Sequence, residues 1–145
     1  MTPTSYEHDF HARALQNARA LREGRLSEID AEHIAEELES MGAAEKRELL
    51  NRLQVLMVHL LKHQFQPERR GKRWLLTIRH QRTGVERLLE QSPSLQHTLT
   101  DARVQSVYEK GVKDAVLEAD LEAHRIPPDC PYALDQLLDE DYLPN

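Results

Sequence analysis

The amino-acid sequence predicts an all-α protein, and three observations carry that prediction. Aromatic residues are sparse, with 2 Phe, 1 Trp and 4 Tyr among 145 residues. Leu, Ala, Glu, Arg and Gln dominate the chain, and these residues favour helices over strands. Apolar residues recur at helical spacing, and no alternating run is typical of a strand. We therefore expect a compact bundle of about five helices plus a short C-terminal helix, in a single domain spanning residues 1–145.

The first predicted helix begins near Thr4. A hydroxyl at Thr4 and a carboxylate at Glu7 can form a capping box around the first turn. Gly24 can adopt the left-handed conformation that ends a helix. Between these signals lies an apolar stripe at helical spacing, formed by Tyr6, Phe10, Ala14, Ala18 and Leu21.

The second and third predicted helices are separated at Gly42. Asp30 is a candidate N-cap for the second helix, whose apolar face contains Ile34, Leu38 and Met41. Gly42 is expected to interrupt this helix, and the next one is expected to begin at Glu45. The block VLMVHLL, within residues 45–65, is apolar on nearly every side, which predicts a central helix surrounded by others. Gln66-Pro67 should end it, because the residue before proline avoids the helical region.

The remaining elements complete the predicted bundle. A fourth helix is expected along the apolar positions Trp74, Ile78, Val85, Leu88 and Leu89. A fifth should run from Ser92-Pro93 to about His124, with Gly111 as a potential kink. Prolines at 127, 128 and 131 indicate an extended link, followed by a short helix over residues 132–138 and an acidic tail.

Charge is distributed unevenly along a chain whose net charge is −6. Residues 62–87 carry 8 basic and 2 acidic groups, whereas residues 114–145 carry 1 and 9. The simpler interpretation is that the basic middle and the acidic end neutralise each other within one fold. The alternative is a basic surface for an anionic partner, which the acidic net charge disfavours.

Several classes of protein are disfavoured by composition. Cys130 is the only cysteine, so an internal disulfide cannot form and a reducing compartment fits. Cys130 has no cationic neighbour within two residues in the sequence that would lower its pKa, so we expect an inert thiol. The first ten residues do not resemble a secretory signal, and the longest apolar block contains His59 and is too short to span a bilayer. We expect a cytoplasmic protein without membrane association.

Two histidines on one helical face are candidate metal ligands. His59 and His63 stand four residues apart and therefore stack on the same face of the third helix. A metal site would need further ligands, for which Glu36 or Glu37 on the preceding helix and His80 on the following one are candidates. No glutamate lies beside His59 to serve as a general base. The favoured interpretation is that His59 is a hydrogen-bonded core residue and that His63 lies at the surface near the helix end.

The basic run at residues 69–73 is the strongest signal for a nucleic-acid or other anionic ligand. Its candidate anion-binding residues are Arg69, Arg70, Lys72 and Arg73, with Arg79, Arg82 and Arg87 further along. Arginines near Trp74 could pair with phosphates while the ring stacks on a base. However, Trp74 begins the apolar stripe of the fourth helix, so we expect it to pack inward. The long predicted helices also do not resemble a helix-turn-helix.

The succession of sequence blocks is similar to a known family. The blocks YEHDF, LREGRLSEID, IAEELESMG, HLLKHQFQPE, WLLTIRHQR, SPSL and CPYALDQLLDEDYLP cover the chain from about Tyr6 to Pro144. In order and spacing they resemble the bacterial family catalogued as domain of unknown function twenty-nine. The resemblance implies a compact all-helical domain and supplies no reaction. It also implies that His59, Glu36, Glu37 and Trp74 follow the family pattern, whereas His63, His11 and Arg13 stand where aromatic residues are usual.

The leading functional interpretation is a non-catalytic protein-interaction or regulatory domain. It rests on the polarised charge and on a sequence that contains neither a phosphate-binding glycine loop nor a nucleophile elbow. No catalytic residue and no cofactor is assigned, and the protein partner is unidentified, with a homo-oligomer as one option. Two alternatives stay open: a nucleic-acid-binding protein that uses the segment from Arg69 to Arg87, and a metal-dependent helical-bundle enzyme centred on His59.

Overall fold

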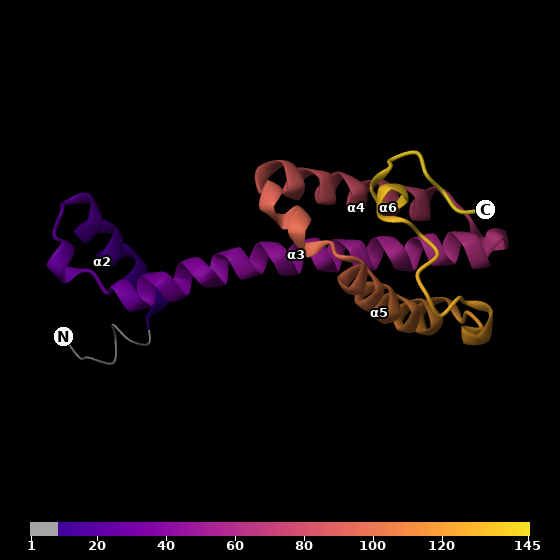
Figure 1. Ribbon diagram of the computed structural model, residues 1–145, viewed down its shortest axis with the longest axis horizontal. Coiled ribbons are helices and arrows are strands. Elements are labelled where there is room, and N and C mark those ends of the chain that lie inside the picture. Colours follow the sequence, from indigo (N-terminus) through magenta and orange to yellow (C-terminus); the bar gives the residue numbers. More distant parts are fainter. Residues whose placement is uncertain (1–8) are drawn as a thin grey trace. The chain divides into compact units, whose positions relative to one another are not determined.

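The computed structural model describes residues 9–145 of the chain. Every regular element in this range is a helix (Figure 1). The all-α prediction is therefore confirmed. The elements are α2 (Phe10–Arg22), η1 (Leu26–Glu28), α3 (Ala31–Phe65), η2 (Pro67–Arg69), α4 (Lys72–Gln91), η3 (Pro93–Thr98), α5 (Asp101–Ala119), η4 (Ala123–Arg125) and α6 (Leu134–Leu138), where η marks a short 3-10 helix. The capping box expected at Thr4 and Glu7 lies outside the described residues. The observed cap of α2 is Asp9, whose carboxylate accepts a hydrogen bond from the amide of Ala12 at 3.0 Å.

The chain divides into two compact units, residues 1–43 and 44–145. Helix α3 contributes residues 31–43 to the first unit and residues 44–65 to the second. The expectation of one domain over residues 1–145 stays a prediction, which the cooperativity of unfolding would test.

The break expected at Gly42 does not occur. Helix α3 is continuous over its 35 residues, and Gly42 does not adopt a positive φ. A glycine inside a helix costs about 1 kcal/mol relative to alanine, which strong helix formers on both sides can offset. The neighbouring sequence, ELESMGAAEKRELL, is rich in such residues and contains no proline. The predicted second and third helices are therefore one helix.

Gly24 behaves as predicted and ends α2. Its φ is +71°, a conformation that L side chains rarely adopt. The amide of Gly24 donates to the carbonyl of Leu21 at 3.2 Å, and the amide of Arg25 donates to the carbonyl of Ala20 at 2.9 Å. This pair of bonds is the Schellman arrangement, which satisfies carbonyls left open at the helix end.

The second unit has one apolar core, built around the C-terminal half of α3. The side chains of Leu49, Leu53, Leu56, Met57, Leu60 and Leu61 are completely buried. Helices α4 and α5 lie on different sides of this half of α3 (Figure 1) and bury Val85 and Tyr108 in the same core. A helix that is apolar all round needs neighbours on several sides. The central helix predicted near residues 45–65 is thus confirmed.

The fifth predicted helix is shorter than expected. The segment after Ser92 forms η3, and α5 begins only at Asp101, where the hydroxyl of Thr100 accepts a hydrogen bond from the amide of Arg103 at 3.2 Å. It ends at Ala119 because Asp120 is left-handed, with φ +51°. The proline at 93 therefore starts a 3-10 segment, and the Thr100 cap starts the α-helix.

The C-terminal part of the chain returns across the second unit. The hydroxyl of Tyr108 donates to the carbonyl of Pro127 at 2.6 Å and fixes the proline link to α5. Helix α6 begins at Leu134, two residues after the predicted start, and ends at Leu138 as predicted. Among the described residues, no helix combines the length and apolar character that crossing a bilayer requires.

Candidate functional site

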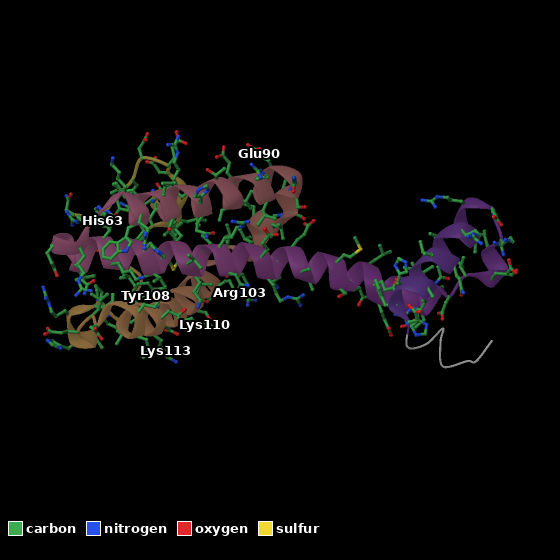
Figure 2. The ribbon with its side chains drawn as sticks, turned by 180° about the vertical axis from the view of Figure 1, so that it is seen from behind. His63, Glu90, Arg103, Tyr108, Lys110 and Lys113 are labelled. Atoms are coloured by element: carbon green, nitrogen blue, oxygen red, sulfur yellow. The ribbon has the colours of Figure 1, made fainter. Side chains whose placement is uncertain are left out.

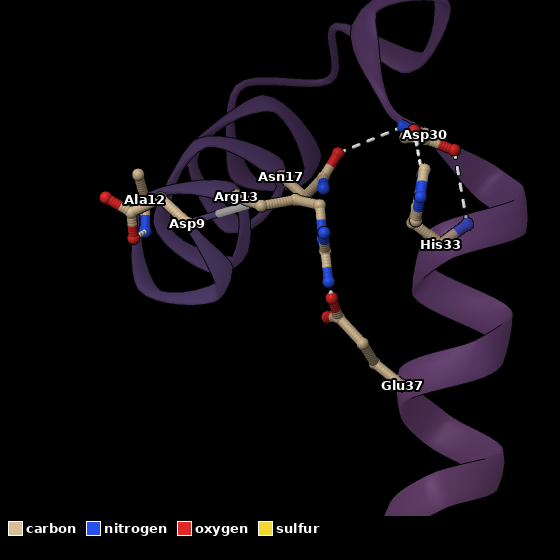
Figure 3. Close-up of polar contacts among 7 residues, drawn as sticks. All are labelled: Asp9, Ala12, Arg13, Asn17, Asp30, His33 and Glu37. Carbon is tan, nitrogen blue, oxygen red and sulfur yellow. Dashed lines mark hydrogen bonds and ion pairs between the residues drawn. The ribbon is translucent and has the colours of Figure 1, made fainter. Parts of the chain in front are cut away.

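The first unit contains an antiparallel helical hairpin formed by α2 and the start of α3. The Nε of Arg13 donates to Glu37 at 2.9 Å, and the side-chain oxygen of Asn17 accepts from the amide of Asp30 at 2.9 Å (Figure 3). The later residue of α2 thus contacts the earlier residue near α3, which makes the two helices antiparallel. Asp30 also caps α3, as predicted, by accepting from the amide of His33 at 3.2 Å. Its hydrogen bonds with His33 lower the pKa of the Asp30 carboxyl.

Apolar side chains follow one flank of each helix in this hairpin. With about 100° of rotation per residue, Phe10, Ala14 and Leu21 share one flank of α2, beside the contacts made by Arg13 and Asn17. The same geometry places Ile34, Leu38 and Met41 on one flank of α3. These two flanks carry four of the large exposed apolar side chains of the first unit. We call this surface the hairpin face; it consists of Phe10, Ala14, Leu21, Ile34, Leu38 and Met41.

The hairpin face is open to solvent. Its four largest exposed side chains are Phe10 at 60%, Leu21 at 47%, Leu38 at 62% and Met41 at 67% exposure. Among residues 9–43 only Asn17 and Ala20 are buried. Scattered exposed apolar residues are normal in proteins, but several large ones in one small unit are typical of an interaction site.

The other flank of α2 lines a more polar groove. This groove has a volume of about 540 Å³ and lies between α2 and η1. Its lining residues are Ala12, Leu15, Gln16, Arg19, Ala20, Arg25 and Glu28. The guanidinium of Arg25 is already paired with Glu23 and Glu28, so the groove holds internal ion pairs. The groove also contains Leu15, which is 57% exposed, so both flanks of α2 expose apolar side chains.

Charge is divided between the two helices of the hairpin. Helix α2 contains three Arg and no acidic residue, whereas residues 31–43 contain four Glu and neither Lys nor Arg. The pair between Arg13 and Glu37 is partly buried, and it uses one residue from each group. Each helix therefore carries charged side chains of one sign.

Comparison with protein families gives one match. The model for "Domain of unknown function DUF29" matches residues 5–143. The chain belongs to the DUF29 family. The match spans nearly the whole chain, so both units of this DUF29 protein fall within it. No curated protein and no solved structure matches the chain.

In the DUF29 chain, His59 and His63 near the C-terminal end of α3 have environments opposite to those predicted. His63 is buried, at 8% exposure, and its Nδ1 hydrogen-bonds the carbonyl of Pro144 at 3.2 Å. His59 is only partly buried, and its Nδ1 contacts the carbonyl of Val55 at 2.9 Å, one turn earlier. The prediction of a core His59 and a surface His63 is wrong, because the C-terminal segment returns over the end of α3 and covers His63. Burial lowers the pKa of both imidazoles.

The candidate metal ligands do not form a cluster. Glu36 and Glu37 belong to the first unit, where Glu37 pairs with Arg13. His80 is exposed on α4. Within residues 9–145 no group of three or more His, Cys, Asp or Glu side chains is arranged to hold a metal ion.

The predicted basic segment separates into exposed and buried residues. Arg69, Arg70, Lys72 and Arg73 are exposed on η2 and at the start of α4, and the Nε of Arg70 donates to the carbonyl of His63 at 2.6 Å. Arg82 is different, because the residue as a whole is buried, with only 4% of its surface exposed. It donates to the carbonyls of Leu137 at 3.0 Å, Tyr142 at 2.7 Å and Gln136 at 3.2 Å. Arg82 therefore holds the C-terminal segment and does not belong to a surface for anions.

The end of α3 contains further buried polar groups that periodicity did not indicate. The ammonium of Lys62 donates to Glu118 at 2.7 Å and lies 5.9 Å from the centre of the Trp74 ring. The amide nitrogen of Gln66 donates to the carbonyl of Ala119. Trp74 is half-buried, so its stripe faces inward as predicted, with one side of the ring toward a cation.

The exposed hairpin face was missed because the sequence interpretation used apolar spacing alone. Spacing correctly placed Leu38 and Met41 on one helical face, and it assumed that another helix covers that face. The unused signal was charge: residues 10–22 are purely basic and residues 31–43 purely acidic among their ionised groups. Segregated charge beside a narrow apolar stripe is typical of surfaces that choose a partner.

Proposed function

We propose that this protein is a protein-interaction module and that it docks a partner on the hairpin face. The observation that carries the proposal is the exposure of Phe10, Leu21, Leu38 and Met41, at 47–67% each, in a unit whose described residues bury only Asn17 and Ala20. Covering apolar surface is the main favourable contribution to association. A hairpin without its own core is stabilised when a partner supplies one.

The second unit supports this proposal by contrast. Its apolar side chains are already buried in its own core, so it can act as a folded scaffold for the hairpin. Helix α3 connects the two units without a break.

Site-specific crosslinking in the native cell tests the proposal. A photo-crosslinking amino acid replaces Leu38 in the full chain, and a matched variant carries it at Lys113, which is exposed on α5 (Figure 2). We expect an intermolecular adduct from position 38 and none from position 113. The proposal is wrong if position 38 gives no adduct, or if it crosslinks only to residues 44–145 of its own chain.

The exposed basic residues favour a second candidate function, which is binding of an anionic partner such as nucleic acid. Arg69, Lys72 and Arg73 are adjacent, exposed and accompanied by a single acidic residue, Glu68. Binding should weaken steeply with salt, because each neutralised phosphate releases counterions. Changing these three residues to Ala should abolish binding, whereas a control with Arg103, Lys110 and Lys113 changed to Ala should retain it. Equal loss in both variants, or no binding by the wild type at low salt, would eliminate this candidate.

A further inference from the structure

The groove between α2 and η1, which we call the α2–η1 groove, has the size of a binding site. Its volume is about 540 Å³, and cavities that bind ligands commonly measure about 300–1,000 Å³. The groove forms because Gly24, with φ +71°, reverses the chain and brings η1 beside α2. Ala12 and Ala20 line it from α2 with small side chains. The groove therefore has room for side chains of a binding partner.

The wall of the groove formed by α2 is apolar and positively charged. Leu15 is 57% exposed, and Arg19, one turn later, is exposed as well. At about 100° per residue, Arg22 returns to nearly the same side of the helix as Leu15. Within the described part of the chain, no carboxylate pairs with Arg19 or Arg22. This wall therefore offers an apolar contact beside unpaired cations.

The wall formed by η1 and the residues before it has the opposite sign of charge. The guanidinium of Arg25 is held by the carboxylates of Glu23 and Glu28. One positive and two negative groups leave this cluster with a net charge of −1. A nucleic-acid strand carries phosphates along its whole length, so the negative wall repels it. A short peptide can instead direct its carboxylates to the α2 wall alone.

We propose that the α2–η1 groove binds an acidic peptide segment of another protein, with an apolar side chain against Leu15 and carboxylates against Arg19 and Arg22. Gln16 is exposed in the same groove, and its amide can donate to and accept from the main chain of that segment. Opposite charges across an interface select partners and speed association. This site is separate from the hairpin face, because it lies on the other flank of α2.

Selection from a library of short random peptides tests the proposal with the full chain as bait. We expect the wild type to enrich peptides in which Asp or Glu accompanies a large apolar residue. Arg19→Glu with Arg22→Glu should change the preference to Lys and Arg, because the α2 wall then carries negative charge. Enrichment without an acidic preference in the wild type overturns the proposal. An unchanged preference in the variant does so too.

The affinity for one selected peptide, carrying a fluorescent label, measures each contact. Arg19→Glu with Arg22→Glu should weaken binding at least about tenfold, because the cations that face the carboxylates are replaced by like charges. Leu15→Ser should also weaken binding, because the apolar contact is lost. All three side chains are exposed, so both variants should keep the helical circular-dichroism spectrum of the wild type. Unchanged affinity in either variant contradicts the assigned contacts.

Matched controls on α5 separate these effects from a general change of charge or polarity. Lys110→Glu with Lys113→Glu makes the same change in net charge, at residues that are exposed on α5 (Figure 2). Leu117→Ser makes the same apolar-to-polar change at a side chain that is 81% exposed. Both controls should bind the peptide as the wild type does. Losses equal to those of the groove variants would overturn the proposal.

Three further measurements separate this site from other modes of binding. Leu38→Ser, on the hairpin face, should leave peptide binding unchanged, and a loss there would assign the peptide to the hairpin face instead. A single-stranded oligonucleotide should not displace the peptide, and displacement would show that the arginines bind phosphates. Self-association of the wild type that disappears with Arg19→Glu and Arg22→Glu would replace the foreign peptide by a second copy. Each of these contrary results overturns the proposal and leaves the crosslinking test at position 38 independent of it.

Discussion

The two ends of helix α3 have opposite surroundings. No residue between 31 and 48 is buried, whereas Leu49, Leu53, Leu56, Leu60 and Leu61 are completely buried further along the same helix. The N-terminal part contacts α2 through polar groups, and its Glu45 accepts a hydrogen bond from the hydroxyl of Ser92. The C-terminal part packs on α4 and α5. Continuity of a helix therefore does not imply continuity of a core, and the stability of the two units should differ accordingly.

The two units should differ most in how much stability they lose when a leucine side chain is truncated. Leu56→Ala empties a completely buried position in the second unit and should cost about 2–5 kcal/mol of unfolding free energy. Leu38→Ala acts on a side chain that is 62% exposed and should change stability by less than about 0.5 kcal/mol in dilute protein. Denaturant unfolding of both variants measures the difference. Similar losses would show that the hairpin face is already covered within one chain.

The next comparison lies within the second unit, between the buried Arg82 and the exposed Arg79. Arg82→Ala leaves the carbonyls of Gln136, Leu137 and Tyr142 without their donor and should cost about 2–4 kcal/mol. Arg79→Ala, on the same helix but exposed, should cost less than about 0.5 kcal/mol. Hydrogen exchange should become faster in residues 134–144 of the Arg82 variant alone. Equal exchange in both variants would mean that the C-terminal segment is held by other contacts.

The sequence predicted where helices form better than it predicted which helix faces other elements bury. The apolar block from Val55 to Leu61 identified the central helix, because a helix that is apolar on every side has to be surrounded. The glycines were harder to interpret: Gly24 ends α2, but Gly42 lies inside α3. Both interpretations used the same residue type, and a glycine alone does not decide between the two outcomes.

The candidate site was predicted only in part, for a related reason. The position of His63 four residues after His59 placed both on one helical face, but burial depends on the distant Pro144, which follows His63 by 81 residues. Arg82 looked like part of a basic surface because its partners are backbone carbonyls, which leave no trace in the amino-acid pattern. Long-range contacts of this kind are invisible to helical periodicity.

Ionisation of buried tyrosines should lower the stability of the second unit at high pH. Burial raises the pKa of Tyr108 to about 12 from its ordinary value of 10.0. Because the folded pKa is the higher one, the protonated phenol contributes stability that is complete below pH 10 and lost as the pH rises toward 12. Tyr108→Phe should remove part of this alkaline decline. It should also cost about 1 kcal/mol at neutral pH, through loss of the hydrogen bond to Pro127.

Unfolding curves recorded between neutral pH and pH 12 measure this effect. Tyr132 contributes in the same direction, because burial also raises its pKa, so the Tyr108 variant should keep a residual decline. A wild type whose stability is flat across this range would show that neither phenol is buried as described. The hairpin has no described tyrosine, so its melting should not respond to the substitution.

The smallest expected effect lies at the boundary of the two units, where Gly42→Ala asks whether α3 is continuous in solution. A methyl group at this position would meet nothing within 4 Å, and the backbone there is helical. Alanine should therefore stabilise the helix by about 0.5–1 kcal/mol, because it reduces the freedom of the unfolded chain without creating a clash. Slower hydrogen exchange of amides 38–46 would report the gain. Gly24→Ala is the matched control, since its φ of +71° strains any L side chain and should make the same methyl group destabilising. If Gly42→Ala instead destabilised the chain, the glycine would be serving as a helix end, and residues 31–41 and 45–65 would be two helices in solution.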